Sequence, residues 1–398
     1  MRLLVTSSRM PFALALIRRF AEAGHTVYAS DTYAAAPGSH SRFLAGHFVT
    51  AAPRTDPEAF AADVERIAGE QSLDLVVPSW EDAFYLAALA HDAPVYTAPF
   101  TTLARLHDKF SFKQLAAELG LRIPETVLAR SPEELREAIA RFPRYFARAV
   151  FSRGGVSLLT NQGPLAGHVA VEDVHPSAEI PWLVQEFVDG PMQCTYSTLH
   201  EGRISAHCAY RAPRQWEHST GIQFLSVDGD ESRAIAARIG EALSYTGQLS
   251  FDFVAAPQGL VMIECNPRTT DGVLLMTSDE LNRGIVEPGP EPALVEAGRE
   301  VQLDFAVVAS ALSQGPGELR HALHDLRHVP GADRGWRDRV PTLYSFLAFA
   351  HHERLSRREH EQLFVAMSDD VCWNGEPIPG MSEADAEALS EIERVRSS

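Results

Sequence analysis

Short apolar runs alternate with helical patterns over the first hundred residues of the chain. Residues 2–6 form an apolar run, and apolar positions at helical spacing follow from Pro11 and stop before Gly24. Further apolar runs lie at 27–29, 75–77 and 95–96, and further helical patterns at 57–70 and 81–90. Strands separated by helices of this length form parallel βαβ units. Residues 1–105 are therefore predicted to be a doubly wound α/β domain with a parallel sheet.

The next two hundred residues mix both patterns at closer spacing. Helical patterns cover 108–119, 131–142 and 231–246, and strand patterns cover 145–151, 156–160, 183–188, 194–199 and 203–210. The stretch 210–221 is polar and is predicted to be a loop, whereas helical patterns dominate beyond residue 300. We therefore expect a second α/β domain over 106–300 and a mainly helical region over 301–398.

The clearest strand pattern is a hairpin that ends at Asn266. Its arms, 249–254 and 260–266, alternate with period two around a turn near Gln258, so Asp252 should lie opposite Glu264. Cross-strand partners have Cβ atoms about 4.5–5.5 Å apart. Glu264 and Asn266 share one face, which Met262 flanks. The opposite face is predicted to be buried and carries Phe251, Phe253, Val261, Ile263 and Cys265.

Two carboxylates and a carboxamide thus converge on one patch of this hairpin. Carboxylates this close repel each other unless a positive charge lies between them. Hard oxygen ligands of this kind suit Mg²⁺, which combines a few carboxylates with phosphates and water. The alternative is a solvated sheet face that Arg268 neutralises. Asp252, Glu264 and Asn266 are therefore a candidate metal site.

Composition and charge exclude several classes of protein. The chain has 398 residues, of which 45% are apolar and 22% charged, as in ordinary globular domains. A net charge of −18 without a basic stripe argues against binding to nucleic acid or to an anionic membrane. The start of the chain lacks the layout of a signal peptide, and no apolar run is long enough to span a bilayer. We expect a soluble, cytoplasmic protein.

The cysteines and lysines add two further observations. The four cysteines, which are Cys194, Cys208, Cys265 and Cys372, are too widely spaced for a C-x-x-C zinc site or a disulfide framework. All basic residues are arginines except Lys109 and Lys113. The arginine bias is typical of a genomic preference, and the two lysines are therefore worth noting.

A dinucleotide site in the first domain is the obvious alternative, because Asp31 follows the second strand. The turn after the first strand, 6–11, contains no glycine. Without glycine the backbone cannot approach a pyrophosphate closely. A solvated strand end explains Asp31 better than NAD binding does.

The sequence Glu264-Cys265-Asn266-Pro267-Arg268, with Asp252 twelve residues before the glutamate, resembles the ATP-grasp superfamily. Other segments agree in order: Asp108-Lys109, Ser152-Arg153-Gly154-Gly155, and 185–191. The closest resemblance is to single-chain relatives of the ATP-binding half of carbamoyl-phosphate synthase and to carboxylate–amine ligases. It implies an ATP-grasp fold with a preceding domain at 1–105, an ATP-grasp domain at 106–300 with a mobile lid at about 125–185, and a helical region at 301–398.

The resemblance also implies a nucleotide site for ATP and for Mg²⁺, which Mn²⁺ can replace. The metal ligands would be Asp252, Glu264 and Asn266. The residues matching nucleotide-binding positions are Lys109, Arg148, Ser152, Gly154, Gly155, Glu186, Val188, Gln193 and Met262. Lys109 and Arg148 would contact phosphates. Gln193, or Met192, stands where relatives have a ribose-binding glutamate, which is a departure. The alternatives are an outward-facing Arg148, an ordinary glycine turn at Gly154 and Gly155, and a Met262 that belongs to the core.

The resemblance places Arg268 beside the carboxylate substrate, and Arg148 beside the transferring phosphate, as catalytic residues. The arginine fork suits bidentate recognition of a carboxylate. Arg211, with Arg214 and His218, is a further candidate for contacts to substrate or γ-phosphate. Solvated residues of a loop are the alternative for these three.

The implied reaction has two steps. A carboxylate attacks the γ-phosphate of ATP to give an acyl-phosphate and ADP, and an amine then displaces phosphate. The expected partners are small-molecule carboxylate and amine substrates, and assembly as a homodimer is compatible with this class. A bicarbonate-phosphorylating enzyme of the carbamoyl-phosphate or carboxylase type and a non-catalytic nucleotide-binding protein are the alternatives. The missing ribose glutamate favours the last of these, and the intact acidic trio opposes it.

Overall fold

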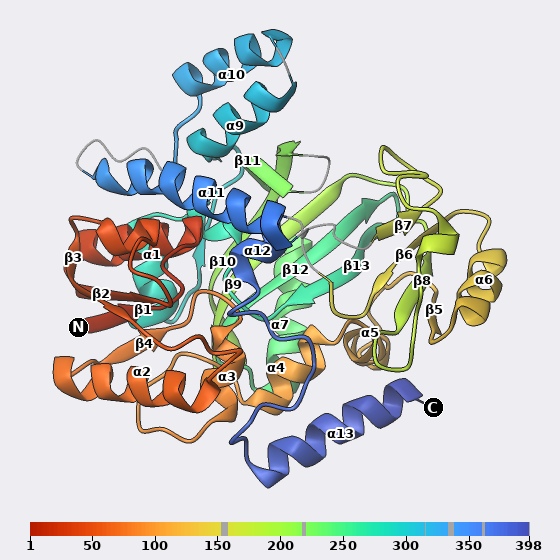
Figure 1. The fold of residues 1–398 in the computed structure, drawn as a ribbon, viewed down its shortest axis with the longest axis horizontal. Coiled ribbons are helices and arrows are strands. Elements are labelled where there is room, and N and C mark those ends of the chain that lie inside the picture. The colour runs from red at the N-terminus through yellow and green to blue at the C-terminus, as the bar shows by residue number, and fades with distance from the viewer. Residues whose placement is uncertain (153–157, 217–219, 315, 333–337, 360–362, 398) are drawn as a thin grey trace.

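The computed structural model of the protein describes all residues except 153–157, 217–219, 315, 333–337, 360–362 and 398. Within these residues the strands form three sheets, and helices surround them in a mixed α/β arrangement (Figure 1) that confirms the predicted fold class. None of the helices among the described residues is both long and apolar enough to cross a membrane.

The first sheet is parallel and has the strand order β3-β2-β1-β4. Its strands are β1 (Arg2–Val5), β2 (Thr26–Asp31), β3 (Leu44–Val49) and β4 (Leu75–Val77). The helices of this region are α1 (Pro11–Glu22), α2 (Pro57–Gln71), α3 (Asp82–Ala88) and the 3-10 turn η1 (Pro37–His40). The run at 95–96, predicted to be a strand, makes only a bridge from Val95 to Val76. The half-buried edge strand β3 was not predicted, because it lacks an apolar run.

The second sheet has the strand order β13-β12-β9-β10-β11-β15, and β14 pairs with β10. Its strands are β9 (Met192–His200), β10 (Arg203–Trp216), β11 (Thr220–Val227), β12 (Gly247–Ala256), β13 (Gly259–Asn266), β14 (Ala293–Leu294) and β15 (Glu300–Gln302). The stretch predicted to be a loop at 210–221 belongs largely to β10 and β11. Its outer residues are exposed or half-buried, so the apolar alternation that marks a strand is missing there.

Helices on one face of this sheet form a core with β12 and β13. They are α4 (Phe100–His107), α5 (Lys109–Glu118) and α7 (Asp230–Leu243). Phe112 of α5 stacks on Phe251 of β12 with ring centres 6.0 Å apart. The segment after β13 contains η3 (Asp271–Leu275), α8 (Ser278–Leu281) and η4 (Asn282–Val286). Burial of Phe112 fixes the first turn of α5 against the hairpin.

The third sheet is small and lies at one side of the molecule (Figure 1). Its strands, in the order β5-β8-β6-β7, are β5 (Thr126–Ala129), β8 (Trp182–Glu186), β6 (Tyr145–Ala149) and β7 (Leu158–Thr160). The helix α6 (Pro132–Arg141) and the turn η2 (Val171–Asp173) belong to the same segment. This sheet has an apolar core of its own around Leu135, Ala147 and Val184.

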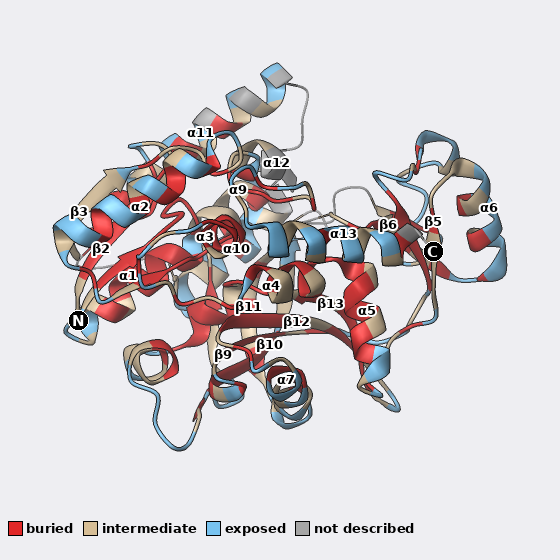
Figure 2. Cartoon of the chain, turned by 90° about the horizontal axis from the view of Figure 1, so that it is seen from below, coloured by how far each residue is buried: buried red, intermediate tan, exposed pale blue. Residues whose placement is uncertain are grey.

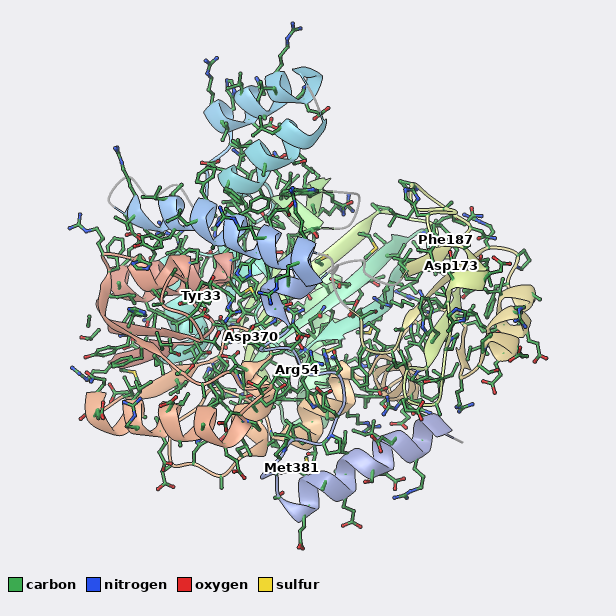
Figure 3. All side chains as sticks on the ribbon, viewed as in Figure 1. Tyr33, Arg54, Asp173, Phe187, Asp370 and Met381 are labelled. Carbon is green, nitrogen blue, oxygen red and sulfur yellow. The ribbon has the colours of Figure 1, made fainter. Side chains whose placement is uncertain are left out.

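The C-terminal region packs against earlier parts of the chain. Its helices are α9 (Asp304–Gln314), α10 (Pro316–His328), α11 (Val340–Glu359), α12 (Leu363–Ser368) and α13 (Glu383–Ser397). Asp370 forms an ion pair of 2.7 Å with Arg9, and Figure 3 shows it near Tyr33 and Arg54. Trp373 is fully buried against Phe84. In Figure 2, α13 lies along α4 and α5, so this region is packed onto the earlier ones.

Candidate functional site

The hairpin register places the two acids opposite each other. Asp252 pairs with Glu264 across β12 and β13, as the alternation predicts. The register then shifts, so that Phe253 pairs with Met262 and Ile263 is the extra residue of a bulge. The two carboxylates therefore share the face of the sheet that turns away from Phe251.

Because of the bulge, the side chains of β13 that precede Glu264 lie on the opposite faces of the sheet from those predicted. Met262 is fully buried in the same cluster as Phe251 and Phe253, not beside the acids. Val261 pairs with Val254, two residues beyond Asp252, on the face of the carboxylates. A one-residue shift reverses every later side chain of a strand. The apolar surface beside the acids is consequently made by valines rather than by Met262.

Two cations from different elements bind Glu264. Lys109 Nζ, at the first turn of α5, lies 3.0 Å from Glu264 Oε1 and donates to the carbonyl of Ser152 at 2.9 Å. Arg148 of β6 binds the other carboxylate oxygen, and its Nη2 donates to the Ile263 carbonyl at 3.1 Å. The small sheet, α5 and the hairpin therefore meet at one carboxylate.

The electrostatics of the two acids differ because of these cations. Burial opposes ionisation of Glu264, but the charges of Arg148 and Lys109 outweigh it and lower its pKa. Burial and the charge of Glu264 raise the pKa of Asp252. Glu264 is thus an ionised carboxylate held by two cations, whereas the positive charges that act on Asp252 beside it do not outweigh burial. An additional cation between them would stabilise both in the ionised form.

Asn266 completes the predicted trio. Its Nδ2 donates to Asp252 Oδ2 at 3.4 Å, and its Oδ1 accepts from Arg268 Nη2 at 3.2 Å. Two carboxylates and an amide oxygen are the hard ligands that Mg²⁺ takes together with phosphate oxygens and water. No ready-made cluster of three His, Cys, Asp or Glu side chains was found in the described part of the chain. The two carboxylates and the amide oxygen fit a Mg²⁺ ion whose remaining ligands are phosphate oxygens and water.

Arg268 connects this patch to the first sheet. Its guanidinium lies 3.6 Å from the centre of the Trp80 ring, and its Nε is 3.6 Å from Glu81 Oε1. Glu81 is fully buried and accepts the backbone N–H of Trp373 at 2.9 Å. Trp80 and Glu81 follow β4, at the carboxyl edge of the parallel sheet, where α/β folds place ligand sites. That position is the signal that could have identified them from the sequence.

Asp271 is a further acid near Arg268 that was not predicted. Burial raises its pKa to about 7, the charge of Arg268 opposes this rise, and the charge of Asp252 adds to it. It lies only three residues after Arg268. An acid so close to the Glu-x-Asn-Pro-Arg sequence could have been recognised as a site residue.

The predicted lid and hinge residues are placed as follows. Gly154 and Gly155 fall outside the described residues. Ser152 is half-buried at the end of the segment that follows β6, with its carbonyl on Lys109. Glu186 is exposed at the end of β8, where it accepts the Glu125 N–H at 3.1 Å. Val188 is half-buried, next to Phe187, which Figure 3 labels on the small-sheet side.

Gln193 lies on the other face of the central sheet. It pairs with Phe253, whereas its neighbour Cys194 pairs with Asp252. Gln193 lines a hollow of about 420 Å³ together with Asp228, Asp230 and Glu231. Its predicted ribose contact remains a prediction, and this geometry does not support it.

Arg211 and Arg214, the predicted site residues on β10, are placed as follows. Arg214 binds Glu318 at 3.0 Å and Asp325 at 2.5 Å, and so anchors α10. Arg211 is exposed and follows Tyr210, which is in the cross-strand row of Cys194 and Asp252. Strand alternation therefore turns Arg211 to the opposite face. His218 lies outside the described residues, and the catalytic role of Arg211 remains a prediction.

Known proteins resemble this chain in sequence over part of its length and in fold over most of it. No family model matches the chain. The carbamoyl phosphate synthase large chain of Thermus thermophilus is 24% identical over 187 residues, which are 43% of this chain. The match spans only 18% of that relative's length.

Solved structures align over most of the chain at low identity. Phosphoribosylamine–glycine ligase of Thermotoga maritima has a TM-score of 0.57 at 16% identity, over 75% of this chain and 78% of its own. N5-carboxyaminoimidazole synthetase of Staphylococcus aureus, complexed with ADP, has 0.58 at 10%, over 79% and 86%. Biotin carboxylase of Campylobacter jejuni has 0.56 at 14%, over 73% and 72%. These likenesses confirm the predicted fold, which is that of the ATP-grasp enzymes.

Proposed function

We propose that the protein is an ATP-dependent ligase that phosphorylates a small carboxylate and joins it to an amine. The observation that carries this proposal is the meeting of Lys109 and Arg148 on Glu264, beside Asp252 and Asn266. Two cations and two hard acids at one point suit a metal-bound polyphosphate. Structures of similar fold were solved with ADP and with its magnesium salt, which supports ATP and Mg²⁺ as cofactors here.

The chain's own residues would provide most of what phosphoryl transfer requires. Lys109 and Arg148 would neutralise phosphate oxygens, and the valines at 254 and 261 would border the nucleotide. Asp252, Glu264 and Asn266 would hold the Mg²⁺, which supplies positive charge between phosphate oxygens when bound. Such transfer depends mainly on positioning and on charge neutralisation. Glu264, now bound to two cations, is the group that would turn toward the metal.

Arg268 would face the carboxylate and later the acyl-phosphate. Its stacking on Trp80 and its contact with Asn266 hold the guanidinium next to the acidic patch. A guanidinium beside a divalent cation is repelled unless an anion lies between them. A substrate carboxylate meets that requirement. The two substrates, the use of Mn²⁺, a homodimer and a cytoplasmic location remain predictions.

An assay of ADP release with pairs of small carboxylates and amines tests the proposal. We expect Mg²⁺-dependent ADP release that needs both substrates, and its loss in Glu264→Gln. Glu133→Gln, on an exposed face of α6, is the matched control and should keep wild-type rates. Release that needs bicarbonate instead would favour the carboxylase alternative. ADP binding without release by any pair would favour a non-catalytic nucleotide-binding protein.

A further inference from the structure

Both lysines of this chain lie on α5, one helical turn apart. Residues four positions apart share a face of a helix. Lys109 and Lys113 are almost completely buried, although every other basic residue of the chain is arginine. The pair therefore faces the interior, beside the acidic patch, and not solvent.

The two lysines differ in their partners. Lys109 Nζ has Glu264 and the Ser152 carbonyl within hydrogen-bonding distance. Among the residues that the structure describes, Lys113 Nζ has no hydrogen-bond partner. A buried ammonium without a partner is strongly unfavourable, and the usual outcome is that it loses its proton. Arginine would not permit this, because its guanidinium stays charged in proteins.

The charged groups that act on Lys113 come from three elements. Burial lowers the pKa of Lys113 to about 7; Arg148 of β6 and Lys109 of α5 add to this, and Glu264 of β13 opposes it. Among the described residues, Glu264 is thus the acid that acts on Lys113. Because Lys109 and Arg148 already bind Glu264, Lys113 has no free negative charge of the described residues to pair with.

A polyphosphate entering beside Lys109 and Arg148 would reverse this balance, because it brings several negative charges. We propose that Lys113 is a third cation of the nucleotide site and gains its proton when the polyphosphate binds. This inference rests on the proposed function. Lys113 acts by its charge, one helical turn after Lys109 on α5, and takes its proton from the buffer. The positive charge is thereby present only when an anion is there to be neutralised.

The presence of only two lysines makes a direct test practical. Lysine labelled with ¹³C at Cε should give two side-chain signals in a protein carrying no added lysine, and the Lys113→Arg and Lys109→Arg variants assign them. The Cε shift reports protonation of Nζ. We expect the Lys113 signal to titrate near pH 7 in the free protein and at least two pH units higher with saturating ADP and Mg²⁺.

Calorimetry provides a second measurement that needs no assignment. ADP binding at pH 8, compared in buffers of different ionisation enthalpy, should take up roughly 0.9 proton per site, as a pKa of about 7 implies. Lys113→Met should take up none and bind ADP about tenfold more weakly. Equal uptake in both proteins, or a Lys113 signal unmoved by bound ADP, would overturn the inference alone. Failure of the wild-type protein to bind ADP would overturn the proposed function as well.

Discussion

The guanidinium carbon of Arg268 lies 3.6 Å from the centre of the Trp80 ring. Trp80 follows β4 of the first sheet, whereas Arg268 follows β13 of the second. A cation–π contact in a buried setting contributes about 2 kcal/mol. The orientation of the arginine proposed to bind substrate is thus set by a residue that follows the first sheet, which supplies none of the predicted metal ligands.

Replacing Trp80 should therefore impair turnover without impairing nucleotide binding. Trp80→Leu removes the ring, and we expect substrate-dependent ADP release to fall by roughly tenfold to thirtyfold. Trp80→Phe keeps an aromatic face and should retain most of the rate. ADP affinity, measured by calorimetry, should be the same in all three proteins. A parallel loss of ADP affinity in Trp80→Leu would show that the ring serves the nucleotide site instead.

The Arg268→Lys variant keeps the positive charge but loses the paired N–H donors with which a guanidinium binds both oxygens of a carboxylate. A lost bidentate contact to a charged group costs on the order of 2–3 kcal/mol, which is roughly 30- to 150-fold in rate. We expect that loss in substrate-dependent ADP release, measured beside the ADP dissociation constant. If ADP binding is lost while turnover at saturating ATP survives, Arg268 contacts the nucleotide and not the substrate carboxylate. The carboxylate role would then have to be assigned to another residue.

Asp271 should make stability depend on pH. Its pKa of about 7 in the fold exceeds the value near 3.9 of an unfolded aspartate. The folded protein therefore binds a proton between about pH 4 and 7 that the unfolded chain does not, and its stability decreases as pH rises through this window. Asp271→Asn removes that loss.

Urea unfolding at pH 5 and pH 8 measures the effect. We expect Asp271→Asn to be more stable than the wild type by on the order of 2 kcal/mol at pH 8, and by much less at pH 5. Asp279→Asn is the control, since the Asp279 side chain is 76% exposed. A difference for Asp271→Asn that is equal at both pH values would contradict this prediction.

Gly375 should be required for the position of Phe151 and Ser152, which follow β6 of the small sheet. Its φ is +90°, and a Cβ there would lie 2.4 Å from the Phe151 ring, next to Ser152. Gly298 has φ +97°, and no atom of the described residues lies within 4 Å of such a Cβ. Gly298→Ala should therefore cost about 1 kcal/mol of strain, and Gly375→Ala at least about 1 kcal/mol more through the clash.

Thermal unfolding of the two glycine variants distinguishes strain from clash. Gly375→Ala should also weaken ADP binding, because Phe151 and Ser152 would move and the Ser152 carbonyl would leave Lys109. Gly298→Ala should bind ADP normally. Equal melting temperatures would mean that the Phe151 ring moves aside at no cost.

The acidic pair could be predicted from the sequence because it is local. A short turn fixes the register of a hairpin, and period-two alternation then fixes its faces, so Asp252 and Glu264 were correctly paired. The bulge at Ile263 could not be predicted, since it adds one residue without a glycine or proline to mark it. Met262 was therefore assigned to the wrong face.

Contacts between distant segments cannot be predicted from the periodicity of a strand and its turns. The resemblance suggested Lys109 and Arg148, but their convergence on Glu264 requires three elements to pack together. Nothing in the pattern around Trp373 indicates that it would enter the core beside Phe84 and support Glu81. Long-range packing of this kind depends on shape and volume, which hydrophobic periodicity does not encode.

The most direct test of the central claim is a calorimetric titration of ADP into the wild-type protein and Glu264→Gln, with and without Mg²⁺. If Lys109, Arg148 and the acidic trio form a metal–nucleotide site, Mg²⁺ should tighten ADP binding to the wild type by at least about tenfold. Glu264→Gln should still bind metal-free ADP but should show no gain from Mg²⁺. Wild-type enhancement by Mg²⁺ in a folded Glu264→Gln protein would contradict the assignment of the site.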